Sequence, residues 1–91
     1  MRYRSDSNMA QIIKTLRNAG ASVFCTSALG HGFPDLVIGW SGSTILAEVK
    51  NLDGRGLKLT SDEENFFRTW KGNVHVITSI EDALALLDQG G

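Results

Sequence analysis

Hydrophobic and polar positions repeat along this chain with two different periods, which predict helices and strands in alternation. Met9, Ile12, Ile13 and Leu16 are three or four residues apart, the spacing of one helix face. Short runs rich in valine, isoleucine and threonine, bounded by glycine, proline and serine, predict strands. The first expected element is a helix that is capped by Asp6, Ser7 or Asn8 and stopped by Gly20. Three strands follow, over 21–26, 35–40 and 44–50. The chain then continues with a helix from Thr60 that ends by 71–73, a strand over 74–78, and a helix after Ser79.

The second helix has two possible capping boxes at its start. Thr60 with Glu63, and Ser61 with Glu64, both have the spacing in which a hydroxyl and a carboxylate satisfy free backbone N–H groups. Ser79 is the expected cap of the last helix. The residues expected to be buried are Phe66, Phe67 and Trp70 in the second helix, and Ile80, Ala83, Leu84 and Leu87 in the last.

The composition is that of one small globular domain over residues 1–91, with a formal charge of −1 and one cysteine. A chain this short is marginally stable alone, so a homodimer would be unsurprising. The single Cys25 excludes an internal disulfide and fits a reducing compartment. No apolar run reaches membrane-spanning length, which makes the cytosol the expected setting.

Pairing between the second and third strands decides whether two carboxylates meet. If Ser41-Gly42 is a two-residue turn, Trp40 pairs with Ser43, and Asp35 falls opposite Glu48 at about 5 Å between Cβ atoms. A three-residue turn would place Asp35 opposite the next residue, on the wrong face, unless a bulge corrected it. The site described next therefore requires the two-residue turn or a bulge.

Asp35, Glu48 and Lys50 form the strongest candidate for chemistry. Glu48 and Lys50 share one strand face, about 7 Å apart along the strand. Two carboxylates at close range repel, so that one takes up a proton or a cation lies between them. Mg²⁺ is typically held by one or two carboxylates together with waters and phosphate. An ordinary alternative remains open, in which Glu48 and Lys50 are a solvated ion pair on an edge strand and Asp35 is a turn residue.

These residues also form the signature of a nuclease family. The chain resembles the PD-(D/E)XK nucleases, and more closely the small stand-alone VRR-NUC-type nucleases of phages and bacteria. The matching pieces are Asp6-x-Asn8, Ile12-Ile13-x-x-Leu16-Arg17-x-x-Gly20, Gly30-x-Gly32-x-Pro34-Asp35-Leu36, Glu48-Val49-Lys50, Leu59-Thr60 with Glu63, Trp70, and Ile80-x-x-Ala83-Leu84. The resemblance implies an α/β fold with a restriction-endonuclease-like αβββαβα core and a mixed four-stranded sheet flanked by helices.

The resemblance also implies roles for individual residues. Asp35 and Glu48 would bind Mg²⁺ or Mn²⁺, with the Val49 carbonyl as a further metal ligand. Lys50 would be the catalytic lysine. Glu63 would act beside it, at a position where the family usually has glutamine, in addition to capping its helix.

The function implied by the resemblance is metal-dependent hydrolysis of DNA phosphodiester bonds by a homodimer in a bacterial or phage-infected cytosol. By analogy, two sites related by a twofold axis suit branched DNA such as a four-way junction. Gln11 lies where the first helix of the family often carries a glutamate, so a second metal ion is in doubt. The alternatives are an RNA-directed nuclease and a catalytically silent nucleic-acid-binding or assembly module on the same fold.

The histidines and tryptophans carry weaker signals. His31 is a loop residue next to the motif, and His75 is expected to be structural. Trp40 and Trp70 are expected in the core or in an interface, in preference to a base-stacking role.

Overall fold

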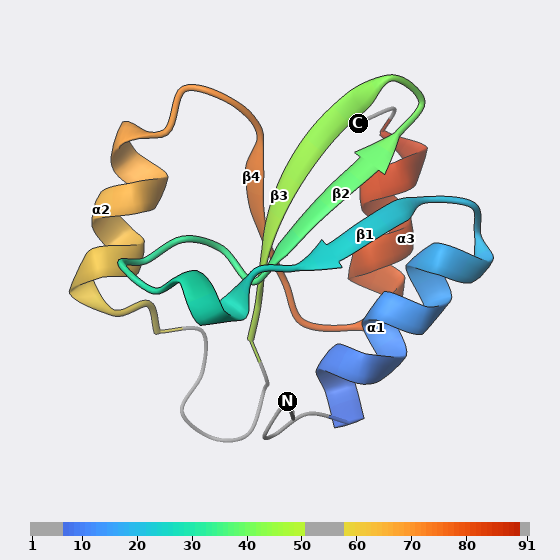
Figure 1. Ribbon diagram of the computed structural model, residues 1–91, viewed down its shortest axis with the longest axis horizontal. Coiled ribbons are helices and arrows are strands. Elements are labelled where there is room, and N and C mark those ends of the chain that lie inside the picture. Colours follow the sequence, from blue (N-terminus) through green and yellow to red (C-terminus); the bar gives the residue numbers. More distant parts are fainter. Residues whose placement is uncertain (1–6, 51–57, 90–91) are drawn as a thin grey trace.

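A mixed four-stranded sheet with three helices forms the protein in a computed structural model, which describes residues 7–50 and 58–89 (Figure 1). Asp6, one of the three candidate helix caps, lies outside the described residues. The elements are α1 (Ser7–Asn18), β1 (Ser22–Cys25), a 3₁₀ helix (Ser27–Leu29), β2 (Leu36–Trp40), β3 (Ser43–Val49), α2 (Ser61–Thr69), β4 (Val74–Ile77) and α3 (Ile80–Asp88). The predicted order of helices and strands is confirmed, with the short 3₁₀ helix added.

The strands lie in the order β1-β2-β3-β4, so β2 and β3 are the two inner strands. β1, β2 and β3 are antiparallel neighbours. A two-residue turn joins β2 to β3, whereas residues 26–35, which include the 3₁₀ helix, connect β1 to β2. β4 runs parallel to β3, and the connection between them contains α2. This connection is required because parallel neighbours cannot be joined by a tight turn.

The three helices lie on opposite faces of the sheet. Figure 1 shows α1 and α3 beside each other on one side and α2 alone on the other. The face under α1 and α3, called the core face below, holds the apolar core. Its buried residues include Ile12, Ile13 and Leu16 of α1, Val23, Leu36, Ile38, Ile45, Ala47 and Ile77 of the strands, and Ala83, Leu86 and Leu87 of α3. The opposite face, which α2 covers in part, is called the site face.

The end of α1 follows from one glycine. Gly20 has a φ of +105°, a conformation that glycine adopts without strain. The Gly20 N–H donates to the Arg17 carbonyl at 3.0 Å, and the Ala21 N–H donates to the Leu16 carbonyl at 3.0 Å. This is the Schellman pattern, which satisfies carbonyls left free at a helix end. It confirms the predicted stop and turns the chain into β1.

Two predictions about buried helix faces are wrong in part. In α2, Phe66 and Phe67 are only half-buried and Trp70 is exposed, because this helix covers the sheet incompletely. In α3, Leu84 is exposed and Leu86 takes its expected place in the core, while Ala83 and Leu87 are buried as predicted.

In the described ranges, 7–50 and 58–89, none of the helices has the length and apolar character needed to cross a membrane.

Candidate functional site

The β2–β3 hairpin has the register that brings Asp35 and Glu48 together. Trp40 pairs with Ser43, and the last ladder pair at the other end is Leu36 with Ala47. Asp35 therefore falls opposite Glu48, as predicted for a two-residue turn. The turn residues Ser41 and Gly42 have φ values of +54° and +82°, as in the type I′ turns that match the twist of a hairpin.

Asp35 is fixed from both sides. Its carbonyl accepts the Thr26 N–H at 2.6 Å, which extends the β1–β2 ladder by one pair. Its carboxylate Oδ2 accepts the Val49 N–H of β3 at 2.9 Å. The preceding Pro34 is fully buried, and its carbonyl accepts the Thr26 hydroxyl at 2.8 Å. The side chain of Asp35 is consequently held at the end of β3, beside Glu48.

Glu48 is a buried carboxylate on an inner strand. It is 4% exposed, and its Oε2 lies 3.4 Å from Lys50 Nζ. The ion pair therefore exists, but it is neither solvated nor on an edge strand, contrary to the ordinary alternative. Burying charge at this position is costly unless it is compensated.

Glu63 of α2 completes the cluster from across the site face. Its Oε1 accepts Lys50 Nζ at 2.8 Å and the Thr60 N–H at 2.9 Å. The Thr60 hydroxyl in turn accepts the Glu63 N–H at 3.1 Å. Of the two predicted capping boxes, the one formed by Thr60 and Glu63 is confirmed. One carboxylate thus caps α2 and connects it to Lys50.

The pKa values of the buried carboxylates respond to this crowding. Burial, the negative charge of Asp35, and the hydrogen bond and charge of Glu63 together raise the pKa of Glu48 to about 8, against the lowering effect of Lys50. Burial also raises the pKa of Asp35 above its ordinary value, against the opposing effects of the Val49 N–H and Lys50. Both carboxyl groups would therefore ionise more readily beside an added cation.

The pKa of Lys50 is raised and the pKa of Glu63 is lowered, as is usual for the two partners of an ion pair. Burial alone would lower the pKa of Lys50, but the hydrogen bond to Glu63 and the charge of Glu48 outweigh it and raise the pKa. Burial alone would raise the pKa of Glu63, but Lys50 and the Thr60 N–H outweigh it and lower the pKa. Lys50 is therefore an ammonium group across the neutral pH range.

The donor set suits a hard cation. The Lys50 N–H donates toward β4, to the Ile77 carbonyl at 3.0 Å. Strand residues alternate in direction, so the Val49 N–H and carbonyl both point to the side of Asp35. Two carboxylate groups and this carbonyl are oxygen donors of the kind that Mg²⁺ and Mn²⁺ prefer. Within the part of the chain that the structure describes, no three His, Cys, Asp or Glu side chains are arranged to hold a metal ion together.

Other candidates from the sequence lie outside this cluster. Gln11 is exposed on α1, which packs on the core face. His31 is exposed in the loop before β2, with a φ of +58°. His75 is half-buried on β4 and shares its strand face with Ile77 of the core.

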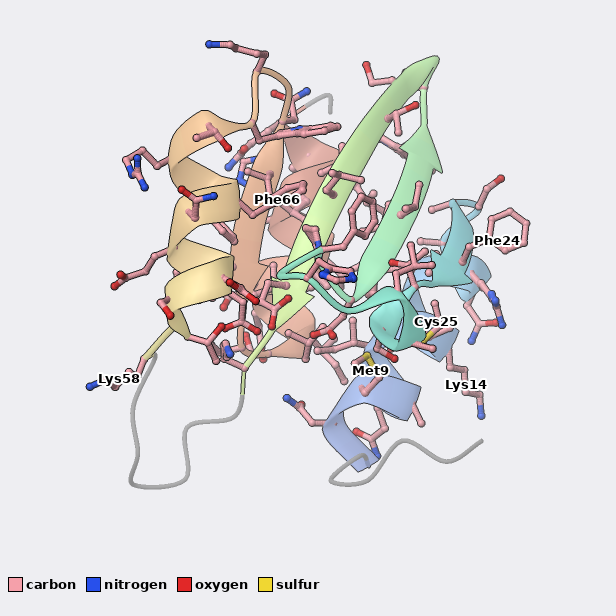
Figure 2. The ribbon with its side chains drawn as sticks, turned by 60° about the vertical axis from the view of Figure 1, so that its left-hand side comes forward. Met9, Lys14, Phe24, Cys25, Lys58 and Phe66 are labelled. Atoms are coloured by element: carbon pink, nitrogen blue, oxygen red, sulfur yellow. The ribbon has the colours of Figure 1, made fainter. Side chains whose placement is uncertain are left out.

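The packing of Gly32 and Phe33 against α2 was not evident from the sequence. Gly32 has a φ of +80°, and a Cβ there would collide with the Asp62 carbonyl of α2. The ring of Phe33 meets that of Phe66 edge to face, with 5.4 Å between centroids. Figure 2 shows Phe66 directed from α2 toward the sheet. A glycine in the pattern Gly32-Phe33-Pro34-Asp35 is consistent with close packing of another segment against the backbone. The sequence did not indicate that this segment is α2.

Two surface hollows lie elsewhere. One, of about 540 Å³, surrounds the β2–β3 turn beside Trp40. The other, of about 360 Å³, lies on the outer side of α1 around Lys14 and Arg17. Neither hollow includes the carboxylate cluster.

Comparisons of this chain with protein-family models, with curated proteins and with solved structures gave no match.

Proposed function

We propose that this protein is a Mg²⁺- or Mn²⁺-dependent DNA endonuclease of the PD-(D/E)XK type, on a restriction-endonuclease-like version of the fold. The observation that carries the proposal is the convergence of four residues at the end of the β2–β3 hairpin. Asp35 and Glu48 face each other by register, and Lys50 lies 3.4 Å from Glu48 and 2.8 Å from Glu63. The resemblance of Pro34-Asp35 and Glu48-Val49-Lys50 to the family signature supports the same assignment.

Asp35, Glu48 and the Val49 carbonyl would hold the metal ion in this proposal. The ion would supply positive charge at the scissile phosphate and lower the pKa of a bound water. The raised pKa values of Asp35 and Glu48 support the fit, because burial disfavours their charged forms and a bound cation would compensate that charge.

Lys50 acts as a cation at the phosphate in this proposal. The hydrogen bond to Glu63 and the charge of Glu48 raise its pKa, which favours the ammonium form. An ammonium group can donate hydrogen bonds to the charge that develops on a phosphate oxygen. Glu63 fixes the direction of that group through the 2.8 Å hydrogen bond, and its own position is fixed by the Thr60 capping box.

The test is metal-dependent cleavage by the Lys50→Ala variant. Supercoiled plasmid and a cruciform substrate are incubated with and without Mn²⁺, beside a Lys14→Ala control, which removes an exposed lysine from α1. Loss of one positioned electrostatic contact typically costs about 100-fold or more in rate. We expect that loss for Lys50→Ala and none for Lys14→Ala. Cleavage that is indifferent to Lys50→Ala would contradict the proposal.

Homodimer formation, branched DNA and a cytosolic setting belong to the same proposal. Two copies related by a twofold axis would present two sites to a symmetric junction. Preferential cutting of the cruciform over linear duplex, together with a dimer mass in solution, is the outcome that supports this extension.

A catalytically silent nucleic-acid-binding module is the second candidate. The observations that favour it are the exposed Gln11 in place of an acidic residue on α1 and the overall charge of −1. Metal-independent DNA binding without any cleavage by the native protein would support this second candidate over the nuclease.

A further inference from the structure

Three aromatic rings form a continuous series from the site to the surface. Phe33 directly precedes Pro34-Asp35, and its ring contacts Phe66 of α2 edge to face. Phe66 then stacks on Trp70, with 5.0 Å between centroids and an interplanar angle of 18°. The series ends in solvent, because Trp70 is 42% exposed.

The two tryptophans of the chain differ in what holds them. The Trp40 indole packs against the core and donates its Nε1–H to the Leu87 carbonyl at 3.0 Å. Trp70 has one neighbour that orients its ring plane, Phe66, and a second at its Nε1 edge, Gly72, where an added Cβ would lie 3.0 Å from that atom. Trp40 is therefore a structural residue, whereas Trp70 is a fixed ring with free surface.

α2 is acidic at the end near the site and basic at the end near the exposed ring of Trp70. The first turn of the helix carries Asp62, Glu63 and Glu64, and the last turn carries Arg68. Lys71, which is exposed, directly follows Trp70. Trp70 comes seven residues after Glu63, which is about 10 Å along a helix axis and on the same side of it.

We propose that Trp70 is a stacking platform for an unpaired nucleobase of the substrate, with the adjacent Lys71 as a contact for its phosphates. Flat aromatic surfaces beside basic residues are how proteins bind single-stranded nucleic acid without sequence preference, because every base has a π face. The stack on Phe66 fixes the indole in advance, so binding costs little side-chain entropy. This inference rests on the proposed nuclease function, and it gives the substrate an unpaired segment about two helical turns from the carboxylates.

The first test measures binding of a short oligothymidylate in EDTA, where no metal-dependent cleavage occurs. Removing a base-stacking ring typically weakens single-strand binding by about tenfold or more. We expect that loss for Trp70→Ala, little loss for Trp70→Phe, which keeps a π face, and the full loss for Trp70→Leu. The matched control is Phe24→Ala, because Phe24 is 70% exposed on β1 (Figure 2) and lies away from α2. Equal losses for Trp70→Ala and Phe24→Ala would overturn the proposal.

The second test uses fluorescence and does not depend on removing Trp70. A Trp40→Phe variant leaves Trp70 as the single tryptophan, and a base stacked on it quenches its emission. We expect saturable quenching by oligothymidylate and much weaker quenching by blunt duplex. Binding of oligothymidylate without any quenching would overturn the stacking role.

These measurements separate the two proposals. Stacking in EDTA together with absent Mn²⁺-dependent cleavage would reject the nuclease and keep the platform. Cleavage that Trp70→Leu leaves unchanged, with unchanged oligothymidylate binding, would reject the platform and keep the nuclease.

Discussion

The two faces of this sheet are held by different forces, although they share the same strands. On the core face, α1 and α3 contribute Ile12, Leu16 and Ala83 with no exposed surface. On the site face, no residue of α2 is fully buried. α2 instead contacts the end of β3 through the Lys50–Glu63 ion pair, and the loop before β2 through the Phe33–Phe66 ring contact.

β3 shows the difference within one strand. Ile45, Ala47 and Val49 point to the core face, where they pack in or against the apolar cluster. Leu46, Glu48 and Lys50 point to the site face, where the polar groups have partners in Asp35 and Glu63. Hydrophobic burial on one side thus stabilises a strand that carries unfavourable charge on the other. This division lets the site hold crowded carboxylates that a small core could not accommodate.

The largest effect on stability is expected from the core face. Ile38→Ala removes a side chain with 0% exposure at the centre of the inner strand β2. Such truncations typically cost about 2–5 kcal/mol, from lost burial and the cavity that remains. Urea unfolding followed by circular dichroism measures the change in the free energy of unfolding. Phe24→Ala, on the open part of the site face, is the control and should change it by less than about 0.5 kcal/mol. Similar losses for the two variants would contradict the division between the faces.

A second effect, which depends on pH, is expected from Glu48 on the site face. Its pKa rises from 4.5 in the unfolded chain to about 8 in the folded protein. Between these values the folded state binds the proton more tightly, so its contribution to stability is complete below about pH 4.5 and is lost as the pH rises through about 8. Glu48→Gln imitates the protonated acid and should flatten this slope. The measurement is the denaturation midpoint at a series of pH values.

Adding Mn²⁺ should change how the stability of the protein depends on pH. Mn²⁺ bound by Asp35 and Glu48 would favour their charged forms, so it should stabilise the native protein more at pH 8 than at pH 5. Asp35→Asn should remove the effect. A melting temperature that Mn²⁺ leaves unchanged at pH 8 would contradict the metal site while leaving the measured pH slope intact.

The smallest effect is expected at the start of α2. Thr60→Ala deletes the hydroxyl that accepts the Glu63 N–H and should destabilise the protein by about 1 kcal/mol, the usual cost of losing a helix cap. Ser61→Ala is the matched control, because it removes the hydroxyl of the next residue, which is not the N-cap of the helix. Thermal unfolding of both variants measures the difference. Equal shifts would mean that the capping box does not hold α2.

The sequence by itself determined the order of the elements, because apolar periodicity located the helices and strands. It left two turn lengths open between the second and third strands, and the structure has the two-residue turn that places Asp35 opposite Glu48. Local chemistry also identified Gly20 as a helix stop and Thr60 with Glu63 as a capping box, although Ser61 with Glu64 had the same spacing.

Only the tertiary structure decided what each helix covers. Phe66, Phe67 and Trp70 have the spacing of a buried stripe, yet α2 lies against a face with too little apolar surface to bury them. Leu84 and Leu86 are two residues apart and therefore lie on nearly opposite sides of α3, and the packing of α3 against the sheet buried Leu86. The hydrogen bond of Glu63 to Lys50, 13 residues away, likewise depends on how the β3–α2–β4 connection folds back. Such contacts between distant segments leave no periodic signal in the sequence, because they depend on how whole elements pack together.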